Sequence, residues 1–162
     1  MKNKKGFLLA EETLKMVIAV ISIFFLVYLL VSIYFASKDK KDLELAEASL
    51  NYLTEQVNAG STEFEIYNPG NPWIIVGWPF DGKIPRACSN LGWRNCLCIC
   101  KRPWYPYIVN PQKIKEVCEG TSVCKELSQR ITTKNNGDFY IPIDNLPLTL
   151  NVNYTTGVIT KK

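Results

Sequence analysis

The sequence predicts an α+β protein in which a long N-terminal helix is followed by a small, disulfide-bonded, antiparallel β-rich head. Residues 16–35 are apolar and carry no charge, residues 43–57 place apolar side chains at helical spacing, and from residue 61 the pattern becomes strand-like alternation. All six cysteines lie in this last part. We therefore expect a helix over residues 7–60, hydrophobic over 7–36 and amphipathic over 37–58, and a head over 61–162.

The uncharged stretch is long enough to cross a lipid bilayer as a helix. At about 1.5 Å per residue, residues 16–35 span roughly 30 Å, which is the thickness of the hydrocarbon core. A helix satisfies its own backbone hydrogen bonds, as a segment in lipid must. The stretch therefore predicts a membrane-spanning helix with the lipid bilayer as its surroundings.

A short motif precedes this helix. Lys4, Lys5, Gly6 and Phe7 are followed by Glu11, the fifth residue after the glycine, and then by the unbroken apolar run. This arrangement resembles the N-terminus of a type IV prepilin, the class III signal peptide, and its wording is most similar to archaeal pilin-type proteins. The resemblance covers about the first 35 residues, and beyond them only the architecture is similar.

The resemblance implies a structural subunit of a type IV pilus-like surface filament. A prepilin peptidase would remove residues 1–6 as a leader by cutting between Gly6 and Phe7 on the cytoplasmic side. Glu11 would then set the register between subunits, often by pairing with the new terminal amine of a neighbour. The implied partners are other copies of the chain, the peptidase and the pilus assembly machinery.

An uncut membrane anchor is the alternative. In that case Glu11 would pair with Lys15, four residues further along the helix, and would lie among the lipid headgroups. The protein would then be a single-pass, membrane-tethered binding protein whose extracytoplasmic head recognises a ligand. A secretory signal peptide agrees less well, because its apolar region would be shorter and no small-residue cleavage site follows residue 35.

Charge and cysteine content together predict the topology. Lys2, Lys4 and Lys5 favour a cytoplasmic N-terminus, although residues 38–41 also carry lysines on the other side of the apolar run. Six cysteines in a small domain indicate an oxidising compartment. We therefore expect the head to be extracytoplasmic, and to be displayed at the cell surface after assembly.

The second part of the helix carries an apolar stripe. Its members follow one another at intervals of three and four residues: Leu43, Ala46, Leu50, Leu53 and Val57. Residues 58–60 form a C-terminal stop with a glycine. The stripe is expected to pack against the head, whether the helix is continuous or broken near residues 38–41.

The head reads as one small antiparallel sheet lying on this stripe. Strand-like patterns cover residues 63–67, 73–78, 96–100, 138–143, 148–154 and 158–160. Residues 155–157 predict a hairpin turn in which Gly157 takes a positive φ. Residues 101–111 are loop-like because Pro103 and Pro106 exclude a central strand. Residues 114–117 and 123–128 are ambiguous.

The cysteine spacing restricts the disulfide pattern. Cys96, Cys98 and Cys100 alternate along a strand and so point to one face, too far apart or badly aimed to bond one another. Each of them would then pair with one of the remaining cysteines, Cys88, Cys118 and Cys124. A local Cys118–Cys124 bridge is the competing pattern. A zinc site is a weaker reading, because the usual two-residue spacing between cysteine ligands is absent.

Composition argues against an enzyme and against any cofactor. The chain contains no histidine and therefore no Ser-His-Asp set. It also has no glycine-rich phosphate loop. The net charge of +4 is mild and forms no basic block, so a nucleic-acid partner is not expected.

Two surface features remain as candidates. Trp104, Tyr105 and Tyr107 either help to fill the core or project from their loop as a contact surface. Asn153 begins an Asn-Tyr-Thr triplet, the acceptor pattern for N-glycosylation.

Overall fold

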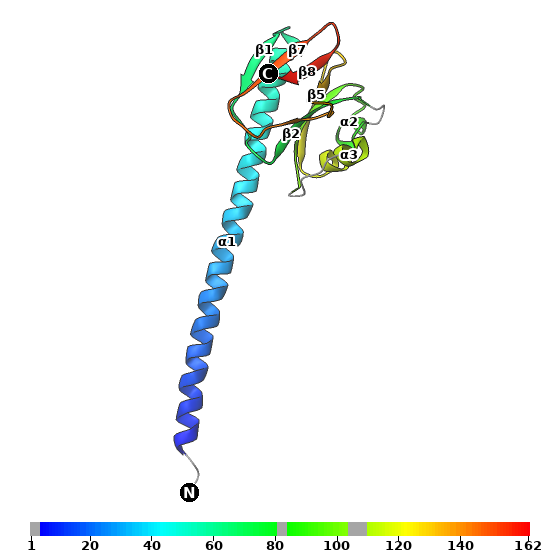
Figure 1. The fold of residues 1–162 in the computed structure, drawn as a ribbon. Helices are drawn as coiled ribbons and strands as arrows, with labels where there is room; N and C mark the ends of the chain where they lie inside the picture. The colour runs from blue at the N-terminus through cyan, green and yellow to red at the C-terminus, as the bar shows by residue number, and fades with distance from the viewer. Residues whose placement is uncertain (1–3, 81–83, 104–109) are drawn as a thin grey trace. The chain divides into compact units, whose positions relative to one another are not determined.

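The computed structural model describes residues 4–80, 84–103 and 110–162, with the backbone alone for residues 4–11 and Pro111. The chain divides into two compact units, Met1–Lys41 and Asp42–Lys162. The first unit contains the beginning of helix α1. The second contains the end of α1 and all the other elements (Figure 1).

Helix α1 extends over Lys4–Asn58 and is continuous through residues 38–41. The break considered there is therefore absent. The helix ends close to the predicted stop. Gly60 has φ +79°, and its N–H and that of Ser61 donate to the carbonyls of Val57 and Gln56 at 3.2 and 3.0 Å. This left-handed glycine satisfies carbonyls that the last helical turn leaves without partners.

The described part of the head contains two four-stranded sheets, where the sequence predicted one. The first has the order β1 (Glu63–Ile66), β7 (Leu148–Asn153), β8 (Val158–Lys161), β5 (Thr132–Lys134). The second has the order β4 (Ser122–Glu126), β3 (Cys96–Lys101), β2 (Trp73–Trp78), β6 (Ile141–Pro142). All pairs are antiparallel except β5 with β8, which is parallel. The prediction of a single sheet is therefore wrong, whereas the predicted antiparallel β-rich head is confirmed, with the β5–β8 pair as a parallel exception.

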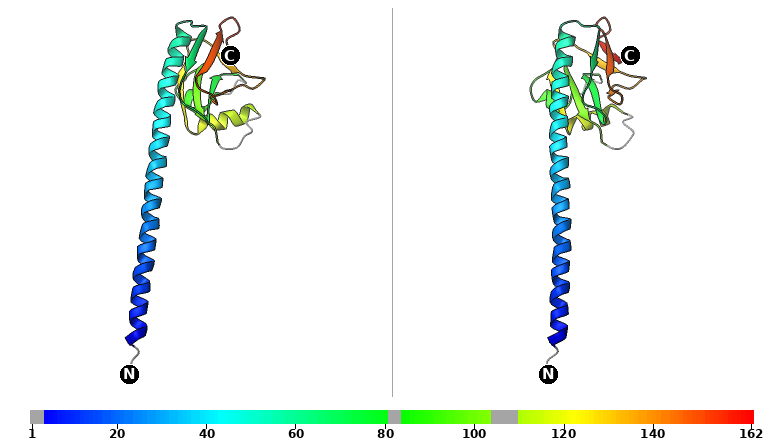
Figure 2. Two further views of the ribbon diagram at one scale, coloured as in Figure 1. Left: turned by 60° about the vertical axis from the view of Figure 1, so that its left-hand side comes forward. Right: turned by 90° about the vertical axis from the view of Figure 1, so that its left-hand side faces the viewer.

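Among the residues that the structure describes, the head also has two short helices, α2 (Arg86–Ser89) and α3 (Pro111–Glu119). Helix α3 resolves the ambiguity of residues 114–117, and β4 resolves that of 123–128. Asn110 caps α3, since its Oδ1 accepts the Lys113 N–H at 2.8 Å. Figure 1 labels the two helices next to each other in the head, and the left view of Figure 2 shows α3 in yellow-green.

The second sheet separates two cores, because alternate residues of a strand point to opposite faces. We call them the helix core and the cysteine core. The helix core joins the α1 stripe to both sheets: Ala46, Leu50, Leu53, Val57, Phe64, Ile66, Trp73, Ile75, Leu97, Ile99, Leu148, Leu150, Val152 and Ile159, among others. The cysteine core joins the other face to α2 and α3: Ile74, Val76, Trp78, Cys88, Cys96, Cys98, Cys100, Ile114 and Cys118, with Cys124 partly buried.

Candidate functional site

The apolar segment of α1, residues 16–35, presents large apolar side chains all around the helix. Every one of them is exposed, from 38% for Leu29 to 70% for Phe24 and Leu30. Helix α1 is long and apolar enough to cross a membrane, by length and composition. A helix that is apolar on every side is stable only where lipid or other protein covers it. The segment is therefore the part of the chain best suited to bind lipid or other helices.

A polar side chain within this segment is already satisfied by its own helix. Ser22 Oγ donates to the carbonyl of Ile18 at 2.8 Å. A hydroxyl bonded one turn back in this way adds little cost in lipid, because it leaves no free donor. The serine therefore does not interrupt the apolar surface.

The motif that resembles a prepilin cleavage site lies at the start of α1. The backbone of Gly6 and Phe7 is helical, whereas the side chains of residues 4–11, Glu11 included, are outside the described part of the structure. The first described carboxylate of α1 is that of Glu12, which is exposed. Cleavage after Gly6 and the assembly role of Glu11 stay predictions.

The second stretch of α1, residues 42–58, contrasts with the first. The predicted stripe is confirmed: Ala46, Leu50, Leu53 and Val57 are at most 1% exposed and belong to the helix core. Leu43 is partly buried against the same core. This stretch packs within the chain itself.

The cysteine core holds three disulfides, Cys88–Cys96, Cys98–Cys124 and Cys100–Cys118. The three cysteines of β3 share one face and each bonds a cysteine of another element, as the alternation predicted; the competing Cys118–Cys124 bridge is absent. Cys98 and Cys124 are direct partners in the β3–β4 register. Cys88 comes from α2 and Cys118 from α3, so the disulfides attach both helices to the sheet.

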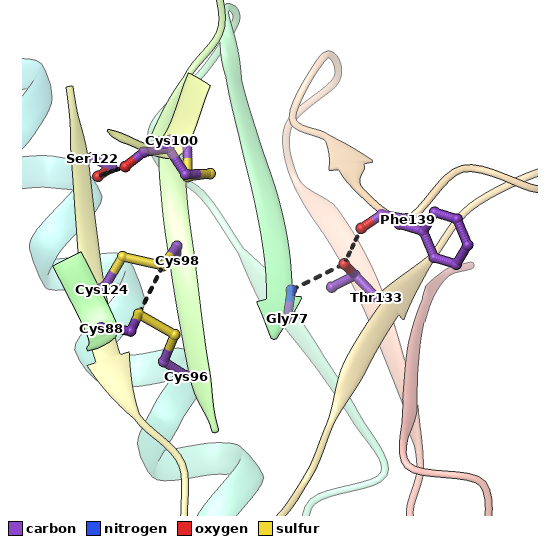
Figure 3. The surroundings of a disulfide bond; sticks show 10 residues. Gly77, Cys88, Cys96, Cys98, Cys100, Ser122, Cys124, Thr133 and Phe139 are labelled. Carbon is purple, nitrogen blue, oxygen red and sulfur yellow. Dashed lines mark hydrogen bonds between the residues drawn. A yellow bond between two sulfur atoms is a disulfide. The ribbon is translucent and has the colours of Figure 1, made fainter. Parts of the chain in front are cut away.

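Two of these disulfides lie against each other (Figure 3). Cys88 Sγ is 3.7 Å from Cys98 Sγ. The contact is van der Waals in kind, because neither disulfide sulfur carries a hydrogen. The Sγ atoms of Cys88, Cys96 and Cys98 lie within 4.8 Å of one another, close enough for a metal ion. Zinc binds thiolates, and these sulfurs are disulfide-bonded, so the donor set does not suit it.

Tyr154 ties the end of α1 to the β7–β8 hairpin. Its Oη is 3.0 Å from the Val57 carbonyl and 2.8 Å from the Ser61 carbonyl, and the single hydroxyl proton is shared between these acceptors. Burial raises the pKa of Tyr154 above its usual value near 10. Sequence reasoning missed this contact, because its partners are more than 90 residues away.

The two other surface candidates differ in what the structure describes. Asn153 is exposed at the end of β7, and its Oδ1 accepts the Thr156 N–H at 3.1 Å. Thr155, the third residue of the triplet, is also exposed, so the triplet is accessible. Trp104, Tyr105 and Tyr107 lie outside the described residues. Both readings of that loop remain predictions.

Comparison with known proteins gives no relative for this chain. No protein-family model, no curated protein and no solved structure matches it.

Proposed function

We propose that the chain is a structural subunit of a type IV pilus-like surface filament. In this proposal a prepilin peptidase cuts it after Gly6, and it assembles with copies of itself through the apolar segment of α1. The observation that carries the proposal is the all-round exposure of the large apolar side chains over residues 16–35. This surface needs a cover, and lipid before assembly and copies of the same segment afterwards both provide one.

The exchange of lipid for other helices gives the segment two roles. In the membrane its backbone is satisfied internally and its side chains contact acyl chains. In a filament the same side chains would pack against neighbouring helices, and van der Waals packing would replace the contacts with lipid. Assembly would break few polar contacts of this segment, because the Ser22 hydroxyl is already bonded to its own helix.

Glu11 would supply the specificity that an apolar surface lacks. An ionised carboxylate in a lipid-like environment costs about 2.5–3.5 kcal/mol on insertion scales unless it is paired. Cleavage after Gly6 creates a terminal amine on Phe7, a cation of the required sign. Pairing between Glu11 of one copy and this amine of a neighbour would select one axial register among many similar apolar contacts.

The head is suited to the outside of such a filament. Three disulfides stabilise a domain of limited size, and they persist in an oxidising, extracytoplasmic compartment. The described head therefore supports the topology with a cytoplasmic N-terminus. The alternative function, an uncut and membrane-anchored binding protein, would have the same topology.

N-terminal sequencing of the mature protein separates these two functions. A chain that starts at Phe7 supports the filament proposal. A chain that starts at Met1 or Lys2 overturns it and favours the uncut anchor.

The adjacent carboxylates Glu11 and Glu12 allow a matched test of the role of Glu11 in setting the register between subunits. Glu11→Ala is expected to abolish filaments in electron micrographs, whereas Glu12→Ala, the adjacent carboxylate, is expected to retain them. Both variants should keep the head intact, which non-reducing mass spectrometry checks as a mass six hydrogens below that of the reduced chain. Normal filaments from Glu11→Ala would contradict the role of this residue.

A further inference from the structure

A surface cleft of about 380 Å³ lies between β5, the β7–β8 turn and two phenylalanine rings. The function proposed above makes no use of it. Its lining combines two cations, Arg130 and Lys134, with the rings of Phe80 and Phe139 and the hydroxyls of Thr132 and Thr156. None of the described residues that line the cleft is acidic. The cleft thus brings together the elements of a site for a small anionic ligand.

The backbone beneath the cleft is held closely from two sides. A Cβ at Gly77 would lie 2.6 Å from the Ile131 carbonyl oxygen, and one at Gly157 would lie 2.7 Å from the Arg130 carbonyl oxygen. Gly157 also has φ +65°, which favours glycine. Only residues without a side chain permit this approach at either position. The segment that carries Arg130 is therefore fixed between β2 and the β7–β8 turn.

Thr133 connects this segment to the aromatic side of the cleft (Figure 3). It is 1% exposed, and its Oγ1 accepts the Gly77 N–H at 3.1 Å and donates to the Phe139 carbonyl at 2.7 Å. One buried hydroxyl thus joins β2, β5 and the segment that presents Phe139. The backbone segments that carry Arg130, Lys134 and Phe139 are therefore connected through this hydroxyl.

The aromatic side is a stack that leads from the cysteine core to the surface. Trp78, fully buried, lies 4.3 Å from Phe80 between ring centroids, and Phe80 lies 4.9 Å from Phe139 with an interplanar angle of 7°. Phe139 is 39% exposed at the outer end. An apolar ring held rigidly at the surface beside cations is suited to contact a ligand ring.

The cations keep donors for a ligand. Arg130 has five N–H donors, and among the described residues it makes one long bond, from Nη2 to the Pro79 carbonyl at 3.4 Å. Lys134 is exposed on β5, four residues further along the chain. The hydroxyl of Thr132 donates to the Gly157 carbonyl at 3.3 Å, which leaves its oxygen able to accept.

We propose that this cleft binds an acidic sugar residue of a polysaccharide, a uronate. A pyranose ring has an apolar C–H face suited to Phe139, hydroxyls suited to the threonines, and a carboxylate suited to Arg130 and Lys134. A single-stranded nucleic acid is less suitable, because its binding requires a cationic groove that follows several phosphates and more than one base. The site is independent of filament assembly, so it holds for a subunit and for an anchored monomer alike.

The binding test uses the full chain in detergent, with trigalacturonate as the probe and maltotriose as its neutral counterpart. We expect trigalacturonate to bind at least tenfold more tightly than maltotriose in calorimetric titrations at low salt. Equal affinity for the two sugars would overturn the role of the cations. Tighter binding of an oligothymidylate than of trigalacturonate, or no binding of trigalacturonate, would overturn the assignment to acidic sugars.

Variants locate the site. Arg130→Gln and Phe139→Ala are each expected to weaken trigalacturonate binding about tenfold. Arg94→Gln, which removes a cation outside the cleft, serves as the control and should retain the affinity of the unaltered chain. All three positions are exposed, so the head should stay folded, which the disulfide-intact mass and the thermal unfolding midpoint verify. If Arg94→Gln lost as much affinity as Arg130→Gln, binding would depend on the net charge of the head and not on the cleft, which would contradict the proposal.

Discussion

Two stretches of helix α1 carry similar apolar residues in opposite surroundings. Over residues 16–35, every large apolar side chain is exposed, whereas Leu50, Leu53 and Val57 in residues 42–58 are at most 1% exposed. Both stretches have the same helical geometry. The difference is the distribution of apolar residues, which surround the helix in the first stretch and occupy one face in the second.

This contrast shows how one helix can be stable in two kinds of environment. The second stretch finds its partner in its own chain, so its burial contributes to the stability of the head. The first stretch has no such partner among the described residues, so its burial contributes only when lipid or another molecule covers it. Substitutions of the same kind in the two stretches should therefore affect different measurements.

The largest effect is expected from the same substitution made in each stretch. Leu53→Ala leaves a cavity in the helix core and should lower the free energy of unfolding of the head by about 2–5 kcal/mol in urea titrations. Leu30→Ala, in the apolar segment, should leave this value unchanged within about 0.5 kcal/mol. A similar loss in both variants would contradict the distinction between the two stretches.

The next effect concerns the face of the second sheet that α1 does not touch. Replacing Cys100 and Cys118 by serine opens a bridge with a sequence separation of 18 residues and should lower stability by about 3 kcal/mol. Since the helix core contains no cysteine, this loss should add to that of Leu53→Ala within about 0.5 kcal/mol. A larger coupling energy in the double-mutant cycle would indicate that the two cores do not act independently.

The parts of the fold that could be predicted are those with a strong local pattern. The long helix, the buried strand β2, the cysteine strand β3 and the β7–β8 hairpin all have a period or a turn residue that a short window reveals. The three-to-three disulfide pattern followed from alternation along β3 alone. Which cysteine pairs with which could not follow, because that depends on where α2 and α3 pack.

The parts that were missed depend on contacts between distant residues. Strand β5 has three residues, of which only Thr133 is buried, so it has no readable period. Its place is set by the close approach of Gly77 to Ile131, which no local pattern reports. The parallel β5–β8 pair and the cleft lie beside this approach, so neither could be predicted from a short window. The start of helix α3 could have been predicted, since Asn110 and Pro111 form a recognised signal for a helix N-terminus.

A smaller effect is expected where the second stretch ends. Tyr154→Phe removes the hydroxyl shared by the carbonyls of Val57 and Ser61 and should lower stability by about 1 kcal/mol. The pKa of Tyr154 is raised in the folded head, so its contribution is fully present below pH 10 and is lost as the pH rises through the raised value. The stability difference between the unaltered chain and the variant should therefore narrow in alkaline buffers. A difference that stays constant there would contradict the role of the phenol proton.

The smallest effect is expected for two hydroxyls, one in each stretch, that make the same kind of hydrogen bond. Ser22 Oγ donates to the Ile18 carbonyl at 2.8 Å, and Thr54 Oγ1 donates to the Leu50 carbonyl at 2.7 Å, each one turn back along α1. The acceptor carbonyls also take part in the helical ladder, so loss of either hydroxyl leaves no buried group without a partner. Thr54→Val should change the unfolding free energy of the head by less than about 0.5 kcal/mol.

Ser22→Ala extends this comparison to assembly. It should leave the yield and length of filaments unchanged in electron micrographs, because a hydroxyl bonded to its own helix adds nothing between copies. Shorter or fewer filaments would mean that Ser22 turns to a neighbouring helix when the apolar segment is covered, as hydroxyls do in some membrane helix pairs. The apolar segment would then recognise its copies through polar contacts as well as through packing, and the role proposed for Glu11 in setting the register would be shared with Ser22.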